Sequence, residues 1–378
     1  MQPGVPHRRD EEELPAELTV IPEPMLPFDE PEIGPSAALR RLRPWIQQPT
    51  LYGSCLVYRE ESPYPAAVCV PNLPELLGDE RLCGFDPDKA LYLDIEATGL
   101  SHGAGTFAFL IGLAYVEDGK VVLEQLFMPD PSDEVPVLGR FLELVERFPY
   151  LVSFNGKSYD LSVLQSRLVV TRLMSRVEVD LKVRPHLDLL HVSRQAYKGV
   201  YENSKLQTLE REVLRIDPAE RANDVPGSMV PALYFHYLTT GYAPHLDPVL
   251  AHNRTDVLSM VTLTRHLLDL LREPHRLACG PTVLHNLGRS ALRKKLNARA
   301  ASLLAAAAES EQLPEPLRHR TLVDLVTACR RGGDIEGAAE AVRSALSHLG
   351  GRDPTEHDRL QRQLHRFERT LIKLARVA

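Results

Sequence analysis

The chain has 378 residues, 44% of them hydrophobic and 25% charged, with a net charge of −7, which is ordinary for a soluble protein of two or three domains. It has no run of about 18 apolar residues and no apolar signal-peptide core near its start, so we expect a cytoplasmic protein without a membrane partner. Its five cysteines form no CxxC pair, which argues against a cysteine zinc site and against a disulfide framework.

Residues 1–35 are acidic and rich in proline. From residue 10 to residue 39 there are nine Asp or Glu and no Lys or Arg, so this tail together with Arg8 and Arg9 carries the whole net charge of −7. Such a segment cannot bury enough apolar surface to order itself, and we expect a disordered tail. Residues 36–88 have mixed character and are expected to form a lead-in segment that packs on the main domain.

The stretch LYLDIEATGL, residues 91–100, alternates apolar and polar side chains in the pattern of a strand with two distinct faces. This alternation places Asp94 and Glu96 on the same face. Two adjacent carboxylates repel each other unless a cation lies between them, and Mg²⁺ or Mn²⁺ prefers such oxygen ligands. An exposed acidic strand face explains the stretch equally well when it is considered alone.

The next elements follow in an order typical of an α/β protein. Two β-prone runs flank the turn Asp118-Gly119 and predict a hairpin, so the first three strands form a meander. Strands then alternate with helices, which predicts a mixed sheet with helices on both faces. The expected elements are strands at 107–117, 120–128 and 150–154, helices at 134–148, from about 158, at 204–214, 229–241 and 248–271, and a strand passing into a helix at 186–197.

Residues 275–378 change character and are almost wholly helical. Pairs of helices of this length with small residues resemble tetratricopeptide-type repeats, and a plain helical appendage is the alternative. A basic run in this part could follow a nucleic-acid backbone, or it could be a solvated helix face. The run consists of Arg289, Arg293, Lys294, Lys295 and Arg299.

The glycine-rich loop SHGAGT, residues 101–106, raises the question of a dinucleotide site. Its spacing is not GxGxxG, it leads into a strand rather than a helix, and Asp94 and Glu96 would repel a pyrophosphate. We therefore exclude a dinucleotide site. The loop is either a flexible turn or a place where a substrate backbone or base comes close to the acidic pair.

Two further acidic features lie downstream. Asp160 is expected in the first turn of a helix, where a carboxylate is favoured by the helix dipole, so simple capping is an alternative to a functional role. In HNRTD, residues 252–256, His252 and Asp256 are four residues apart and share one helix face. A local link between helix turns would also explain this pair.

This combination resembles the DEDD exonuclease superfamily, whose DnaQ-type members have a ribonuclease-H-like fold, and it is most similar to the YprB-like subgroup. The resemblance implies a ribonuclease-H-like exonuclease domain over residues 89–272, followed by an all-α domain over 275–378. The matching stretches are DIEATGLSHGAGTFAFLIGLAY, VSFNGKSYDLSVLQSRL, HLDLLHVSR, NDVPGSMVPALYFHYLTTG and VLAHNRTDVLSM.

The resemblance implies a two-metal hydrolase of phosphodiester bonds, a 3′→5′ exonuclease acting on a single-stranded end of DNA or RNA. Asp94 would bridge two Mg²⁺ or Mn²⁺ ions, Glu96 and Asp256 would complete the ligand shells, and Asp160 would act mainly through water. His252 would be the general base. Its spacing departs from the family pattern, in which His stands five residues before the last Asp or Tyr stands four before it. One helical turn still brings His252 and Asp256 to the same site.

Other residues are candidates for substrate contact. Thr98 and Gly99 follow the acidic strand, and Asn155 and Lys157 lie beside Asp160, although turn chemistry explains Asn155 better than substrate contact does. Asp188 is either a fifth acidic group or a strand-end residue bonded to the backbone. Two other functions remain open: a non-catalytic module that holds nucleic acid and binds a protein partner through the C-terminal helices, and an endonuclease or nucleotide hydrolase of the same fold.

Overall fold

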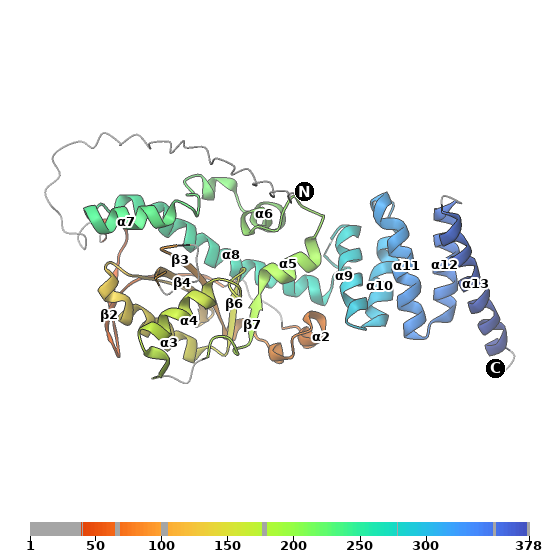
Figure 1. Ribbon diagram of the computed structural model, residues 1–378, viewed down its shortest axis with the longest axis horizontal. Helices are drawn as coiled ribbons and strands as arrows, with labels where there is room; N and C mark the ends of the chain where they lie inside the picture. The colour runs from red at the N-terminus through yellow and green to blue at the C-terminus, as the bar shows by residue number, and fades with distance from the viewer. Residues whose placement is uncertain are drawn as a thin grey trace, which may run out of the picture. The chain divides into compact units, whose positions relative to one another are not determined.

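The computed structural model describes residues 39, 41–64, 69–99, 105–175, 180–277, 279–350 and 353–375 (Figure 1). The predicted disordered tail over residues 1–35 and most of the glycine-rich loop lie outside the described residues. Within the described part, no helix combines the length and the apolar character needed to cross a membrane.

The described strands form one seven-stranded mixed sheet in the order β1-β2-β5-β4-β3-β6-β7. Four neighbouring pairs are antiparallel, namely β1–β2, β2–β5, β5–β4 and β4–β3, whereas β3–β6 and β6–β7 are parallel. This confirms the predicted α/β fold with a mixed sheet. The strands are β1 (Ile46–Thr50), β2 (Gly53–Pro63), β3 (Ala90–Ala97), β4 (Ala108–Glu117), β5 (Lys120–Phe127), β6 (Tyr150–Ser153) and β7 (His186–Asp188).

The hairpin between β4 and β5 forms where the sequence predicts it. Asp118 and Gly119 have φ angles of 49° and 74°, the pair of positive values that a two-residue type I′ turn requires. The turn sets the register in which Gly112 of β4 lies opposite Gln125 of β5. On its other side β4 pairs with β3, where Gly112 lies opposite Asp94.

The lead-in segment differs from the prediction. Strand β2 pairs along most of its length with β5, and β1 pairs with β2, so this segment extends the main sheet instead of packing on it. The sheet therefore begins before residue 89, where the sequence suggested a boundary. Cys55 and Val57 of β2 are buried in the same core as Phe127 of β5, and this packing stabilises the two added strands at the edge of the sheet.

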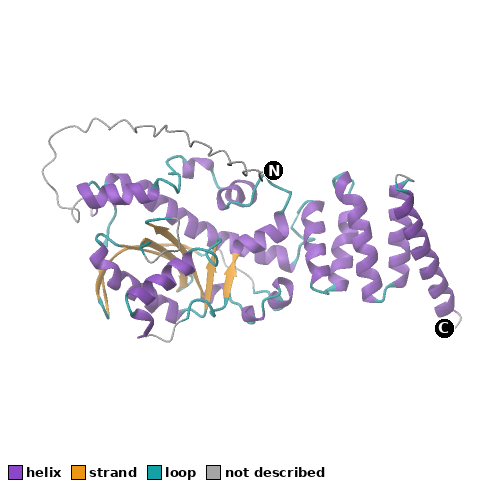
Figure 2. Cartoon of the chain, in the orientation of Figure 1, coloured by secondary structure: helices purple, strands orange, loops and turns teal. Residues whose placement is uncertain are grey.

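Helices cover both faces of the sheet (Figures 1 and 2). One core joins Leu91 and Leu93 of β3 to residues of α3 and α4, and a second joins Tyr92 to α5 and α8. Asp94 and Glu96 have the parity of Tyr92 and therefore face α8. The helices up to this point are α2 (Leu73–Leu77), α3 (Glu134–Arg147), α4 (Asp160–Val170), α5 (Leu189–Tyr197), α6 (Leu206–Leu209), α7 (Val230–Thr240) and α8 (Asp247–Arg272).

The C-terminal part is helical, as predicted, and each helix packs against the next around its own core (Figure 2). Small residues such as Ala338, Ala341 and Ala345 are buried at these contacts. The resemblance to tetratricopeptide repeats stays a prediction. The helices are α9 (Pro281–Arg293), α10 (Asn297–Glu309), α11 (Glu315–Gly332), α12 (Ile335–Leu349) and α13 (Pro354–Ala375).

Part of the basic run identified in the sequence serves the junction between sheet domain and helical part. Lys294 Nζ donates to the carbonyl of Leu76 and lies 3.0 Å from Gln195 Oε1, while Arg299 donates to the carbonyl of Leu271. Arg289 forms an ion pair with Asp324 at 3.0 Å. These three cations are therefore engaged within the chain, and only Arg293 and Lys295 of the run are exposed.

The buried His285 of α9 gives a prediction for stability. Its imidazole lies 2.8 Å from Thr321 Oγ1, and burial, with Arg289 and Arg320 nearby, lowers its pKa to about 4. The unfolded chain takes up a proton on this imidazole near pH 6.5, whereas the folded chain does so only near pH 4. The free energy of unfolding therefore falls as the pH drops from about 6.5 toward 4. We expect a loss of about 2 kcal/mol between pH 7 and pH 5 that His285→Gln does not show.

Urea unfolding of wild type and His285→Gln at both pH values measures this difference. An equal loss of stability in the two proteins would contradict the prediction.

Candidate active site

Asp94 and Glu96 lie next to each other along the outgoing end of β3. Asp94 is opposite Gly112 of β4, Glu96 is opposite Leu110, and the register shifts directly after Glu96. A bulge of this kind ends the regular pairing and re-aims the chain, which is common beside functional sites. The strand therefore ends at the two carboxylates, as the sequence predicts.

Asn253 of α8 ties this strand to the helix above it. Its Nδ2 donates to Asp94 Oδ2 at 2.8 Å, and its Oδ1 accepts a hydrogen bond from Gln125 Nε2 of β5 at 2.9 Å. Gly112 makes this contact possible, because a Cβ atom there would lie 2.2 Å from Asn253 Oδ1. The fully buried Asn253 was not identified from the sequence. Its only signals are its place inside HNRTD and a glycine within an apolar strand.

Asp160 is the first residue of α4 and is buried. The turn before it is tight, since a Cβ atom on Gly156 would lie 2.5 Å from Ser153 Oγ and 2.9 Å from Asp160 Oδ2. Gly156 N donates to Ser153 Oγ at 3.1 Å. Glycine at this position therefore allows the Asp160 carboxylate to sit against the end of β6.

The Gly156→Ala variant tests this packing. We expect a loss of about 1–3 kcal/mol in the free energy of unfolding, because an added methyl group in a filled site forces its neighbours apart. Urea unfolding measures the loss, with Gly227→Ala as the control because a Cβ there meets nothing within 4 Å. Equal stability of the two variants would show that the turn has room to spare.

Asp188 anchors the loop that carries Asn155 and Lys157. Its carboxylate accepts hydrogen bonds from the backbone N–H groups of Asn155 at 2.9 Å, Lys157 at 3.2 Å and Leu190 at 3.1 Å. The last contact caps α5. This geometry matches the alternative of a strand-end aspartate bonded to the backbone.

The other candidate substrate residues are held by contacts of their own. Thr98 exchanges two hydrogen bonds of 2.9 Å with the backbone of Phe107, and the Gly99 carbonyl accepts a hydrogen bond from Tyr159. These contacts close the base of the glycine-rich loop, whose residues 101–104 lie outside the described part. Asn155 adopts a φ of 69° and Lys157 Nζ lies 3.7 Å from Asp79.

His252 and Asp256 share one face of α8, as predicted from their spacing. His252 Nε2 is 3.6 Å from Asp256 Oδ2, and its Nδ1 donates to Asp224. Arg221 donates to Asp256 as well. Asp224 and Arg221 come from the segment before α7 and were not identified from the sequence, where nothing in their spacing relates them to α8.

Asp94 and Glu96 respond to the negative charges of Asp160 and Asp256, which indicates that these four carboxylates lie near one another. Loss of water contact raises the pKa of Asp94 well above its usual value, and Asp256 and Asp160 raise it further. The pKa of Glu96 is raised by burial and by Asp94, Asp256 and Asp160. Burial and Asp188 raise the pKa of Asp160 to about 7.

The pKa values of Asp256 and His252, which face each other on α8, are each subject to opposing influences. Burial raises the pKa of Asp256, and His252 and Arg221 only partly offset this effect. Burial lowers the pKa of His252, but Asp256, Asp224 and Asp94 outweigh it and the net shift is upward. Such mutual shifts arise when like charges share a poorly hydrated site, which is the situation that a bound cation relieves.

The donor chemistry of this cluster fits hard divalent cations, because its potential ligands are carboxylate oxygens. The side chains of the cluster do not converge on a single point. Among the described residues, no three His, Cys, Asp or Glu side chains are arranged to hold a metal ion. Hydrogen bonds explain part of this, since Asn253 holds an oxygen of Asp94 and Arg221 holds an oxygen of Asp256.

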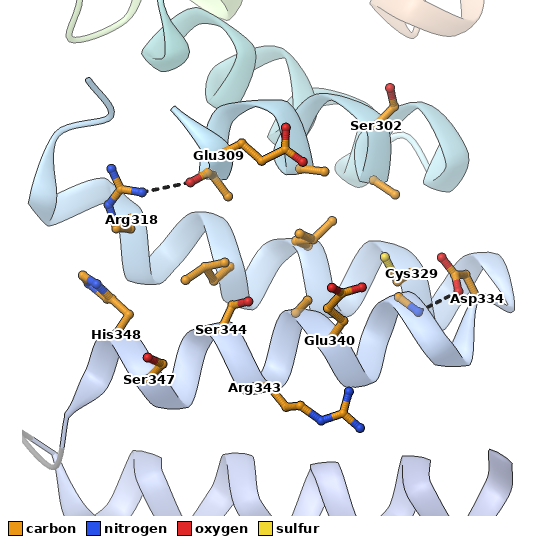
Figure 3. A pocket seen from close by; sticks show the side chains of 17 residues that line it. Ser302, Glu309, Arg318, Cys329, Asp334, Glu340, Arg343, Ser344, Ser347 and His348 are labelled. Carbon is orange, nitrogen blue, oxygen red and sulfur yellow. Dashed lines mark hydrogen bonds between the residues drawn. The ribbon is translucent and has the colours of Figure 1, made fainter. Parts of the chain in front are cut away.

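A separate cavity of about 1030 Å³ lies in the helical part (Figure 3). Leu322, Leu325 and Cys329 of α11 line it together with small residues of α10 and α12. At its ends Arg318 donates to the carbonyl of Ala308 at 2.9 Å, and Asp334 accepts from the N–H of Gly337 at 2.8 Å. The cavity contains none of the four carboxylates.

Comparison with known proteins points to the same segment. Residues 91–268 match a family described as belonging to the RNase_H superfamily, and this range includes Asp94, Asp160 and Asp256. The chain is also 36% identical over 195 residues to a protein of Bacillus subtilis (strain 168) described as "Uncharacterized protein YprB". The alignment covers 51% of this chain and 45% of that relative, so the chain spans less than half of its length.

Proposed function

Because residues 91–268 form a ribonuclease H superfamily domain, we propose that this protein is a metal-dependent nuclease that hydrolyses phosphodiester bonds. The observation that carries the proposal is the set of four carboxylates from β3, α4 and α8, in which the negative charges of Asp160 and Asp256 raise the pKa of Asp94 and of Glu96. A cluster of like charges destabilises a folded protein, and a bound cation would neutralise this repulsion.

Asp94, Glu96 and Asp256 are the ligands we assign to two Mg²⁺ or Mn²⁺ ions, with Asp160 acting mainly through water. When bound, the ions supply the clamp on attacking and leaving oxygens that an in-line displacement needs. His252 is the general base in this proposal. Asp224 holds the Nδ1 proton, so Nε2 on the Asp256 side is the nitrogen that takes a proton from water.

The substrate in this proposal is a single-stranded end of DNA or RNA, attacked in the 3′→5′ direction as the family resemblance implies. Thr98, Gly99 and Lys157 are the proposed contacts to the strand. Lys157 is suited to this role because its partly exposed ammonium lies 3.7 Å from Asp79, and an ion pair at this distance is weak. A phosphate could therefore displace Asp79 at little cost.

A binding module without activity is the second candidate. The helical cavity is the feature that favours it, because a protein partner could dock there (Figure 3). The acidic cluster opposes it, since four carboxylates without cations repel the phosphates that such a module would hold.

Hydrolysis of labelled single-stranded and duplex DNA and RNA tests the proposal. We expect cleavage with Mn²⁺ or Mg²⁺ and none with EDTA, and stepwise shortening from the 3′ end. Substrates blocked at the 3′ end separate the two classes of nuclease, because an endonuclease still cuts them. Hydrolysis that persists in EDTA would overturn the metal-dependent mechanism.

A further inference from the structure

Arg221 makes an unusual set of contacts beside the candidate site. It ends the short helical turn Pro218–Arg221. Its guanidinium donates to both oxygens of Glu210, from Nε at 2.9 Å and from Nη2 at 2.5 Å, and the same Nη2 also donates to Asp256. Its Nη1 lies 3.2 Å from His252 Nδ1 and 3.5 Å from Asp224 Oδ2.

The two carboxylates that hold Arg221 have different roles. Glu210 is 2% exposed and binds the guanidinium in the two-pronged geometry that is strongest for Arg. Asp256 takes only one bond from it and belongs to the cluster that raises the pKa of Asp94. Glu210 is therefore the anchor, and Asp256 is the partner that Arg221 can release without losing its place.

We propose that Arg221 and a divalent cation compete for the Asp256 carboxylate, so that Arg221 sets the metal affinity of the site. This inference rests on the proposed function, because it takes Asp256 to be a metal ligand. The oxygen that accepts from Nη2 cannot offer the same lone pair to a metal, and a guanidinium beside a divalent ion repels it. Metal binding therefore transfers Asp256 from Arg221 to the ion while Glu210 retains the arginine.

A merely structural arginine would behave differently. Removing a structural ion pair loosens its surroundings and weakens a metal site that depends on them. Removing a competitor strengthens metal binding. The sign of the change in metal affinity thus separates the two roles.

The test is Mn²⁺ affinity of the full chain, measured by calorimetry at pH 7.5 for wild type, R221Q and R211Q. Arg211 is the matched control: it lies in the helical turn Glu210–Leu214 next to Glu210, is exposed, and pairs only with Glu202 and Glu212 in the described part. We expect R221Q to bind Mn²⁺ roughly ten-fold more tightly, the worth of one charged hydrogen bond, and R211Q to stay within about two-fold of wild type.

R221K provides a second variant should R221Q fail to fold, because lysine keeps the charge but makes a single, weaker contact. Its expected affinity lies between those of wild type and R221Q. Unchanged or weaker Mn²⁺ binding in the folded variants overturns the inference. Tighter binding by R221Q together with no hydrolysis by wild type overturns the proposed nuclease instead, and no Mn²⁺ binding by any variant overturns both.

Discussion

Replacing Asp94 by Asn is expected to lower metal-dependent hydrolysis by about 10³-fold or more, because it removes the carboxylate at the centre of the cluster. The same change should leave thermal stability equal or higher. Asp94 is half-buried and the negative charges of Asp256 and Asp160 disfavour its ionised form, while a neutral amide oxygen can still accept the hydrogen bond from Asn253. Initial rates of hydrolysis and the thermal midpoint measure the two effects.

Asp269→Asn is the control for this variant. Asp269 lies on the same helix as Asp256 and pairs with Arg265 and Arg272 at 4.0 and 3.7 Å, away from the acidic cluster. The activity of Asp269→Asn should stay within about two-fold of wild type, as expected for a partly exposed charge in loose ion pairs. Full activity of Asp94→Asn would remove the carboxylate cluster from the mechanism altogether.

Gly112→Ala is expected to cost about 2–3 kcal/mol of stability and to lower hydrolysis, although Gly112 carries no functional group. The new Cβ would lie 2.2 Å from Asn253 Oδ1 and 2.7 Å from its Nδ2. Asn253 must then move, and it would leave Gln125 and Asp94 with unpaired buried groups. Urea unfolding and initial rates measure both losses.

Gly227→Ala again serves as control, since its Cβ would meet nothing within 4 Å. Asn253→Ala provides a comparison, because it removes the same hydrogen bonds without the steric conflict. If Asn253 positions Asp94, both Gly112→Ala and Asn253→Ala lose activity. Wild-type rates in Asn253→Ala would show instead that the amide only fills space.

Features that depend on neighbours in the sequence were predictable. The β4–β5 hairpin follows from Asp118-Gly119, and the shared face of Asp94 and Glu96 follows from strand alternation. The shared face of His252 and Asp256 follows from their helical spacing. In each case the relevant geometry repeats within a few residues, so the sequence alone specifies it.

Contacts between distant segments were not predictable in the same way. Arg221 reaches Asp256 across 35 residues, and Asn253 reaches Asp94 across 159. No periodicity relates these positions, and the ligand and general-base roles that the family resemblance implied fell only on the acidic residues and the histidine. The pairing of β2 with β5 was missed for a similar reason, since its two strands are far apart and the proline-rich surroundings of β2 suggested a peripheral segment.

The central claim is that the four carboxylates hold catalytic divalent cations. A crystal structure with Mn²⁺ and a non-hydrolysable oligonucleotide, located by the anomalous signal of manganese, tests this claim most directly. The predicted result is two ions about 4 Å apart that share Asp94, with Glu96 and Asp256 as further ligands and Arg221 on Glu210 alone. Manganese bound elsewhere, or an Asp256 still held by Arg221 with no ion beside Asp94, would contradict the account.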